Sequence, residues 1–211
     1  MVAKMKIEKI INKIAQENTY ILSNSTSQLI IDPGSDSSAL FEFLKVTDKT
    51  VSAILLTHAH FDHIMGLNDL KEIFPDVPIY LHHLEKDWMK NPELNASLFF
   101  LGSPITGPDA DQFYEINKVY EMNDFTFRVL ETPGHSIGGV SLLFNNSFLF
   151  SGDALFKNAI GRFDLPTGNQ SQLLNSIREQ LFTLNDNVQV FPGHGSKTTI
   201  GAEKNFNPFF R

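Results

Sequence analysis

The sequence contains no cysteine, which excludes disulfide bridges, thiolate metal ligands and a cysteine nucleophile. It has no apolar run long enough to span a membrane, and its opening segment "MVAKMKIEKIINKIAQEN" interrupts the apolar residues with Lys, Glu and Asn. Basic residues are few, 17 against 24 acidic ones, and they form no cluster of the kind that binds nucleic acid. We therefore expect a cytoplasmic protein with no nucleic-acid or membrane partner and no evident protein partner.

Apolar residues, by contrast, are plentiful. They make up 42% of the 211 residues, and Phe alone accounts for 19 positions. A chain of this length can bury a core of its own without disulfides or a structural metal. Because no linker or shift in composition divides the chain, we predict a single domain over residues 1–211.

Strand-like and helix-like segments alternate along the chain, which indicates an α/β layered fold. Runs of β-branched and aromatic residues predict strands at residues 5–11, 18–22, 28–31, 50–57, 77–82, 124–132, 138–144, 147–152 and 188–193. Amphipathic patterns predict a helix capped by Asp36 or Ser37 and further helices at residues 66–74 and 169–184. Residues 91–113 have no clean period and contain three prolines, which is typical of a functional flap or of loose structure.

The stretch "THAHFDH" places His58, His60, Asp62 and His63 directly after a predicted buried strand. The whole chain has only seven histidines. In an extended chain His58, His60 and Asp62 would point to one side and His63 to another, whereas a helix would pair these side chains locally. Four such residues within six positions at a strand end indicate metal ligands rather than core or surface residues.

Three further polar side chains also follow predicted strands. They are His135 in "TPGHS", Asp153 in "SGDALF" and His194 in "FPGHG", and each has a glycine nearby that lets the backbone approach closely. Imidazole and carboxylate ligands without thiolate suit zinc, iron or manganese. Seven ligands exceed one tetrahedral site, so we expect two divalent metal ions that share one carboxylate, with zinc first and iron or manganese as alternatives.

The H-x-H-x-D-H pattern and the later His, Asp and His resemble the metallo-β-lactamase superfamily. The segments "NTYIL", "IIDPG", "GRFDLPTGN" and "TTIGAEKNFNPF" are similar to those of the glyoxalase II-like hydrolases, the hydroxyacylglutathione hydrolase type, over nearly the whole chain. The resemblance implies a four-layer αβ/βα sandwich, with two mixed sheets flanked by helices and the site along one edge of the sheets. Full-length glyoxalase II carries a C-terminal helical domain that helps to hold glutathione, and we expect no such domain here because the sequence ends at Arg211.

The resemblance also implies which ligands hold which ion. The first metal would be bound by His58, His60 and His135, and the second by Asp62, His63 and His194, with Asp153 bridging both. A hydroxide between the ions would attack an acyl carbonyl, which gives Asp62 and Asp153 catalytic roles. Arg162 would bind a substrate carboxylate, or else pair with Asp164 to fix its loop. The cationic site would suit a small anionic thioester such as a hydroxyacylglutathione.

Other functions within the superfamily remain open. The commonest zinc β-lactamases use a cysteine ligand, which is absent here, and flavodiiron proteins have a Glu where His60 stands. A mononuclear-iron glutathione persulfide dioxygenase resembles this group and would use only His58, His135 and Asp153. Lactone or phosphodiester hydrolysis is a further alternative. A non-catalytic metal-binding protein is disfavoured because a closed structural site does not need seven ligands.

Several other residues have two interpretations each. Asp32, in "IDPG", either accepts a hydrogen bond from a ligand histidine or forms an Asx-type turn. His82 and His83 match no ligand of the family, so we expect them to be structural or surface residues. The stretch "LFFL" at residues 98–101 either lines a substrate entrance or, more simply, packs in the core.

Overall fold

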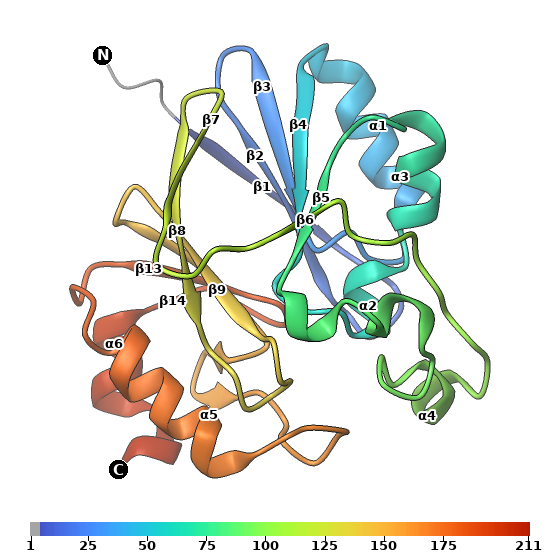
Figure 1. The fold of residues 1–211 in the computed structure, drawn as a ribbon. Helices are drawn as coiled ribbons and strands as arrows, with labels where there is room; N and C mark the ends of the chain where they lie inside the picture. Colours follow the sequence, from blue (N-terminus) through green and yellow to red (C-terminus); the bar gives the residue numbers. More distant parts are fainter. Residues whose placement is uncertain (1–4) are drawn as a thin grey trace.

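Two six-stranded sheets lie face to face in the computed structural model, which describes residues 5–211 (Figure 1). The first sheet contains, in spatial order, β1 (Lys6–Ile11), β2 (Asn18–Ser23), β3 (Ser27–Ile31), β4 (Thr50–Leu55), β5 (Ile79–Leu81) and β6 (Gln112–Phe113). The second contains β14 (Thr198–Thr199), β13 (Gln189–Pro192), β10 (Phe148–Gly152), β9 (Val140–Phe144), β8 (Phe125–Glu131) and β7 (Val119–Met122). Both sheets are mixed, because β3 to β6 pair parallel in the first and β10 pairs parallel with β13 in the second.

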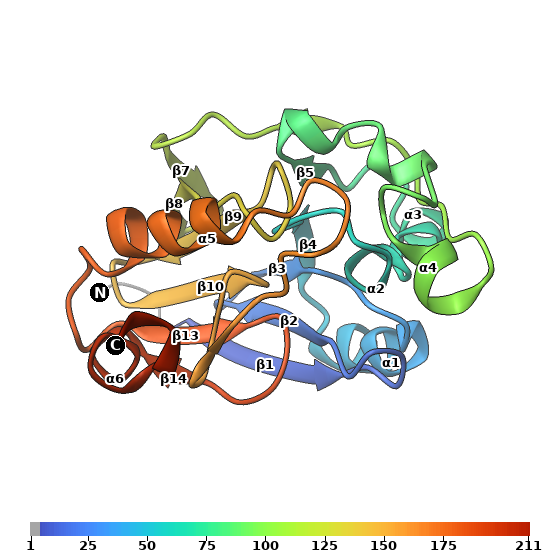
Figure 2. The same ribbon diagram turned by 90° about the horizontal axis from the view of Figure 1, so that it is seen from below.

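Helices cover the outer face of each sheet (Figures 1 and 2). Those against the first sheet are α1 (Ser37–Thr47) and α3 (Leu67–Ile73). Those against the second are α5 (Gln170–Ser176), the π-helical turn η3 (Ile177–Leu181) and α6 (Ile200–Phe206). Shorter elements are α2 (Phe61–Ile64), η1 (His83–Glu85), η2 (Trp88–Lys90), α4 (Ser97–Leu101), β11 (Leu155–Phe156), β12 (Ala159–Ile160) and η4 (Pro208–Phe210). The predicted αβ/βα sandwich is therefore confirmed.

The central strands β2, β3, β9 and β10 are buried on both faces because each sheet packs against its partner sheet and against helices. In β2, Tyr20 faces the core between the sheets, whereas the next residue, Ile21, faces the core beneath α1. In β10, Phe150 lies between the sheets, and Leu149 packs toward α5. Side chains alternate along a strand, so neighbouring residues enter different cores. This alternation builds the four layers.

The core between the sheets is rich in aromatic residues. Phe127 stacks on Tyr120 and on Phe144, with ring centroids 5.0 and 4.8 Å apart. Phe144 in turn meets Phe150 edge-on. Aromatic pairs of this kind add to the stabilisation from burial alone. This aromatic row crosses the second sheet, and Tyr20 of the first sheet meets Phe150 edge-on at 5.1 Å, so aromatic contacts also link the two sheets whose ends carry the candidate site.

Two local predictions need correction. Asp36 stands at the N-cap of α1, but its carboxylate accepts the backbone N–H of Lys13 and does not cap the helix. Residues 91–113 are not loose, because they contain α4 and β6 and are held by the buried side chain of Asn95, which donates to the carbonyl groups of Trp88 and Ile105. Local sequence does not indicate these contacts, because each depends on how the chain folds back on itself.

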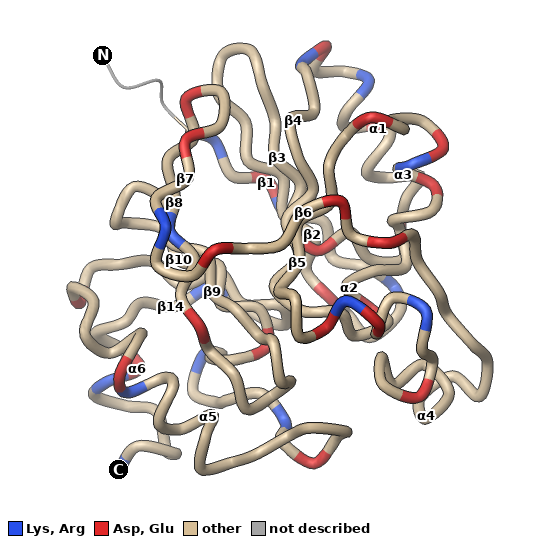
Figure 3. Tube along the Cα trace, in the orientation of Figure 1, with Lys and Arg blue, Asp and Glu red and all other residues tan. Residues whose placement is uncertain are grey.

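Two general predictions can also be compared with the fold. The predicted domain of residues 1–211 includes residues 1–4, which lie outside the described residues. Between residues 5 and 211 no helix has both the length and the apolar character needed to cross a bilayer. Lys and Arg are spread over both halves of the described chain, with Asp and Glu between them (Figure 3).

Candidate metal centre

The predicted ligands converge on one edge, where strands of both sheets end. Four of them follow strands directly or after a short turn: His58 after β4, His135 after β8, Asp153 after β10 and His194 after β13. A backbone hydrogen bond joins the sheets at this edge, since the N–H of Val140 donates to the carbonyl oxygen of Thr57 over 2.9 Å. The fold therefore brings together side chains from distant parts of the sequence.

The "THAHFDH" stretch combines two backbone conformations. His60 is extended (φ −67°, ψ 152°) and forms the N-cap of α2, which begins at Phe61. The expectation that Asp62 continues an extended row with the histidines before it is therefore wrong, and so is a helix through the whole stretch. The change at His60 directs Asp62 and His63 toward a different group of ligands.

The first group consists of His58, His60 and His135. The Nδ1 atom of His60 lies 2.8 Å from Nε2 of His135, which lies 3.3 Å from Nε2 of His58. All three rings are buried. Burial lowers the pKa of each imidazole, to about 3 for His60, so all three are neutral near pH 7. Three neutral imidazole nitrogens that face one another form a donor set for a transition-metal ion.

The second group consists of Asp62, His63 and His194. Asp62 Oδ2 lies 3.3 Å from Nε2 of His194 and 3.9 Å from Nε2 of His63. Burial alone would lower the pKa of His194, but Asp153 and Asp62 outweigh burial and raise that pKa to about 10. The pKa of His63 is also raised, because nearby carboxylates outweigh its burial. This group thus concentrates negative charge around its imidazoles.

Asp153 lies between the two groups. Its Oδ2 atom is 3.6 Å from Nε2 of His135 and 3.4 Å from Nε2 of His194, and its Oδ1 atom is 3.5 Å from Nε2 of His63. Burial would raise the pKa of this carboxyl, but His194 and His63 hold it well below the ordinary value. Asp153 is therefore an ionised carboxylate in contact with both groups, the position that the resemblance assigns to a bridging ligand.

The chemistry of these donors fits a pair of cations. Within each group of three the ligand atoms lie within 4.8 Å of one another. Among the described residues, His63 Nε2 and Asp153 Oδ1, which lie 3.5 Å apart in the centre, are buried without a hydrogen-bond partner. Buried polar atoms rarely stay unpaired, so these donors fit a pair of bound cations. The assignment of the seven residues as metal ligands stays a prediction.

Asp32 supports the histidines from behind. Its carboxylate accepts hydrogen bonds from the N–H and the hydroxyl of Thr57, over 2.7 and 2.6 Å, and Oδ2 lies 3.1 Å from Nδ1 of His63. The Thr57 hydroxyl in turn lies 3.1 Å from Nδ1 of His58. These contacts favour the interpretation of Asp32 as a partner of ligand histidines over the Asx-turn interpretation.

Glu85 is a buried carboxylate that the sequence analysis missed. One of its oxygens accepts the N–H of Ala59, between His58 and His60, over 2.6 Å. The other accepts the N–H of Gly138, three residues after His135, over 2.9 Å. Glu85 thus connects the two loops that carry the first group. The local sequence "HHLEKD" offers no signal for this role, because both partners are distant in the chain.

The first residues of β2 hold the loop that carries His194, and the sequence did not indicate this role. The N–H of Asn18 donates to the carbonyl of Gly193, and the Asn18 side chain donates to the carbonyls of Pro192 and Gly195. The Tyr20 hydroxyl donates to Pro192 over 2.7 Å. The sequence signals a strand here, but it does not show that the strand's end fastens the loop of His194.

The structure shows the local contacts of Arg162 and of His82. Arg162 forms a two-pronged ion pair with Asp164, with N···O distances of 2.8 and 2.9 Å. The loop-fixing alternative is thus present, and substrate binding by Arg162 stays a prediction. His82 is buried, accepts the N–H of Leu84 and lies 3.5 Å from Glu131, so it is structural as expected.

A cavity of about 400 Å³ opens over the two groups. It is lined by Ala15, His60, Phe61, Asp62, Phe100, His135, Asp153, Phe156, Ile160, Arg162, Leu165 and His194. Residues 98–101 form α4, and all four side chains are exposed, so core packing is wrong for this stretch. Phe100 instead belongs to the cavity wall, which agrees with the entrance alternative.

The chain belongs to the metallo-beta-lactamase superfamily, whose family model matches residues 13–194. It is 45% identical to a protein of Streptococcus pyogenes serotype M6 named "Probable metallo-hydrolase", over 98% of this chain and 90% of that protein. It is also 35% identical to hydroxyacylglutathione hydrolase GloC of Haemophilus influenzae, over 97% and 98% of the two chains.

Solved structures give the same placement. The BLEG-1 B3 metallo-beta-lactamase superimposes with a TM-score of 0.93 at 42% identity and covers 97% of this chain and 99% of its own. TTHA1623, solved in a di-iron-bound form, superimposes with a TM-score of 0.84 at 35% identity and covers 96% and 99%. These neighbours support a centre for divalent metal ions at the edge where the ligands converge.

Proposed function

We propose that this protein is a dinuclear metal-dependent hydrolase that cleaves a thioester, for which a hydroxyacylglutathione is the reference substrate. One observation carries the proposal: two adjacent groups of three ligands, one of imidazoles and one containing a carboxylate, meet at Asp153. The similarity to GloC of Haemophilus influenzae supports the choice of substrate class. Zinc is the metal we expect first, and the di-iron form of TTHA1623 keeps iron as the alternative.

Three carboxylates of the chain have separate roles in this proposal. When bound, two divalent cations supply an ionised water near neutral pH and polarise the acyl carbonyl. Asp153 sets the separation of the two ligand groups, because its carboxylate contacts both. Asp62 adds negative charge to the second group only. Asp32 holds the ring of His63 from the side opposite the cavity and thereby keeps its Nε2 atom aimed at the centre.

A second candidate is β-lactam hydrolysis. Its basis is the similarity to the BLEG-1 B3 metallo-beta-lactamase, at 42% identity and a TM-score of 0.93. An amide in a strained ring and a thioester are both attacked at an acyl carbon, so one set of ligands serves either reaction. The two candidates differ in the leaving group, which remains attached to the product in the lactam and departs as a thiol in the thioester.

The test combines metal analysis with a panel of substrates. The purified protein is analysed for metal identity and stoichiometry, and it is then assayed with S-lactoylglutathione, a β-lactam and glutathione persulfide. We expect two ions per chain and release of thiol from the thioester. One iron per chain with oxygen uptake on the persulfide would overturn the proposal in favour of the dioxygenase. Turnover of the β-lactam alone would replace it with the second candidate.

A further inference from the structure

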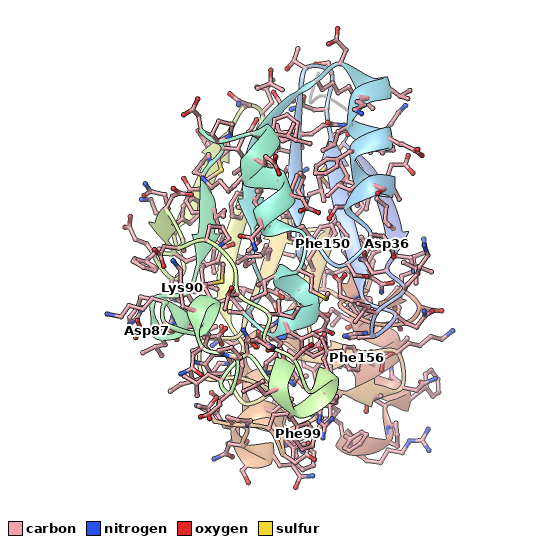
Figure 4. All side chains as sticks on the ribbon, turned by 90° about the vertical axis from the view of Figure 1, so that its right-hand side faces the viewer. Asp36, Asp87, Lys90, Phe99, Phe150 and Phe156 are labelled. Atoms are coloured by element: carbon pink, nitrogen blue, oxygen red, sulfur yellow. The ribbon has the colours of Figure 1, made fainter. Side chains whose placement is uncertain are left out.

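The cavity above the ligands has a polar floor and apolar walls. Its floor consists of the predicted ligands His60, Asp62, His135, Asp153 and His194. Its walls consist of Ala15, Phe61, Phe100, Phe156, Ile160 and Leu165, with Arg162 as the one charged lining residue outside the predicted ligands. In Figure 4, Phe99 and Phe156 lie toward the same end of the molecule, well away from Phe150 in the core. The part of a substrate that fills the cavity beside the floor would therefore lie against carbon.

Phe61 and Phe100, two aromatic residues of this wall, contact each other, and Phe61 lies within the "THAHFDH" stretch. The N–H of Phe61 donates to the carbonyl of Asn95 over 2.9 Å, and Asn95 is buried at the base of α4. The ring of Phe61 lies 5.5 Å from that of Phe100 on α4. These contacts fix α4 beside the centre, so Phe100 is a built part of the cavity rather than an accidental surface residue.

The one charged wall residue already has a carboxylate partner. Two donors of Arg162 are taken by Asp164, which also offsets the charge of the guanidinium. The guanidinium carbon lies 5.0 Å from the ring centroid of Phe100 and 5.9 Å from that of Phe99. A glutathionyl group carries two carboxylates, an ammonium and two peptide bonds, and the walls hold few partners for them.

We propose that this cavity binds the acyl chain of the substrate and selects apolar acyl thioesters, aliphatic or aromatic, over hydroxyacyl ones. This inference rests on the thioester hydrolysis of the proposed function, and it replaces the hydroxyacyl group of the reference substrate with an apolar acyl group. The apolar walls adjoin the floor directly, so they contact the group attached to the carbonyl carbon, whereas the polar thiol carrier extends toward solvent. In the reaction the oxygen of water bonds to the acyl carbon and the C–S bond breaks. The products are a carboxylate, a proton and a thiol formed from the thiolate and the second proton of water.

A binding experiment tests the cavity without any turnover. Acetate, butanoate, hexanoate and octanoate, analogues of the carboxylate product, are titrated into the zinc-loaded protein and followed by calorimetry. We expect the affinity to rise by about twofold to fourfold for each methylene until the walls are covered. The same series of acyl groups on N-acetylcysteamine, with a lactoyl thioester added, gives the matching values of kcat/KM.

A pair of variants on one helix provides the control. Phe100 lines the cavity, whereas its neighbour Phe99 is 72% exposed and does not line it. In Phe100→Ser we expect the preference for hexanoate over acetate to fall about tenfold, because several methylenes lose their wall. In Phe99→Ser we expect the preference to stay within about twofold of the parent protein, because Phe99 contacts Phe100 and Arg162 from outside the cavity and does not line it.

The outcomes separate this inference from the proposed function. A flat affinity series, a preference for the lactoyl thioester, or equal losses in both variants would overturn the apolar selection even if thioesters are cleaved. Rising affinity that depends on Phe100, without cleavage of any thioester, would overturn the thioester reaction and still support an apolar cavity. Rising affinity together with a rising kcat/KM supports both.

Discussion

The two halves of the candidate centre are built on opposite principles. In the first half three imidazoles are buried together, and burial lowers the pKa of each one. In the second half a carboxylate stands beside two imidazoles, and the attraction between opposite charges raises the pKa of His63 and His194 despite burial. The first half is therefore shaped by the exclusion of water and the second by charge pairing.

The halves also differ in what holds them. The loops of the first half are connected by one carboxylate, Glu85, which accepts an N–H from each loop. The loop of His194 in the second half is held by several groups of one strand, including the backbone and side chain of Asn18. Loss of one support should thus harm the first half more sharply than the second.

Replacement of Asp153 should have the largest effect, because this carboxylate contacts both halves. In Asp153→Ala we expect the metal content to fall by at least one ion per chain. Thioester cleavage should fall on the order of a thousandfold, since a cation contributes several kcal/mol to stabilising the reacting charge. Elemental analysis and initial rates measure the two effects. A fully active, fully loaded Asp153→Ala protein would refute the central position of this residue.

Gly193→Ala should damage mainly the second half. A Cβ atom at Gly193 would lie 2.2 Å from Asp153 Oδ1 and 2.8 Å from Cε1 of His63, so both side chains would have to shift. We expect metal affinity in the second half to fall by about 10- to 100-fold, as when a ligand loses its orientation. Competition with a chromophoric chelator resolves the two binding steps. Equal loss in both steps would show that the halves are not separable.

Glu85→Gln should damage mainly the first half. The amide NH₂ would replace one acceptor and leave a buried backbone N–H of Ala59 or Gly138 without a partner, at a cost of about 1–3 kcal/mol in stability. We expect the metal affinity of the first half to fall by about tenfold and that of the second half to change little. Cobalt substitution adds a spectrum that reports the geometry of the imidazole group.

A second buried glutamate provides the control for Glu85. Glu203 is also buried and accepts the N–H of Asn158 and the hydroxyl of Thr198, in contacts around α6. Glu203→Gln should lower the free energy of unfolding by a similar amount and leave metal affinity and the cobalt spectrum as they are. If the two variants lose metal equally, Glu85 acts only through general stability.

Tyr20→Phe should give the smallest effect. Its hydroxyl donates one hydrogen bond to Pro192, and the neighbouring contacts of Asn18 remain. We expect a loss of about 1 kcal/mol in the free energy of unfolding, with metal affinity changed less than about twofold. Denaturant titration measures the first and chelator competition the second. Tyr120→Phe, which removes a hydrogen bond to the N–H of Glu115, is the matched control away from the centre.

Residue patterns predicted much of the fold because the order of apolar and polar residues shows which faces of a strand or helix are buried. Continuous apolar strands implied sheets that are buried on both faces, and Tyr20 and Ile21 enter two different cores as that implies. The candidate ligands could be selected because histidine and aspartate are unusual directly after a buried strand. The sequence did not predict that the chain turns into a helix at Phe61. The backbone N–H of Phe61 donates to Asn95, and Asn95 lies in a segment that has no clean pattern.

By itself the sequence determined the types of the candidate ligands, their positions at strand ends and the absence of any thiolate, because these depend on residue identity and short-range periodicity. The family resemblance implied that Asp153 bridges the two groups, but only the tertiary structure gave the distances that place it between them, and only the structure showed that Glu85 connects the loops of one group and that Phe100 walls the cavity. Those facts depend on distances between residues far apart in the chain. Such distances are set by the packing of two sheets, which no local pattern encodes.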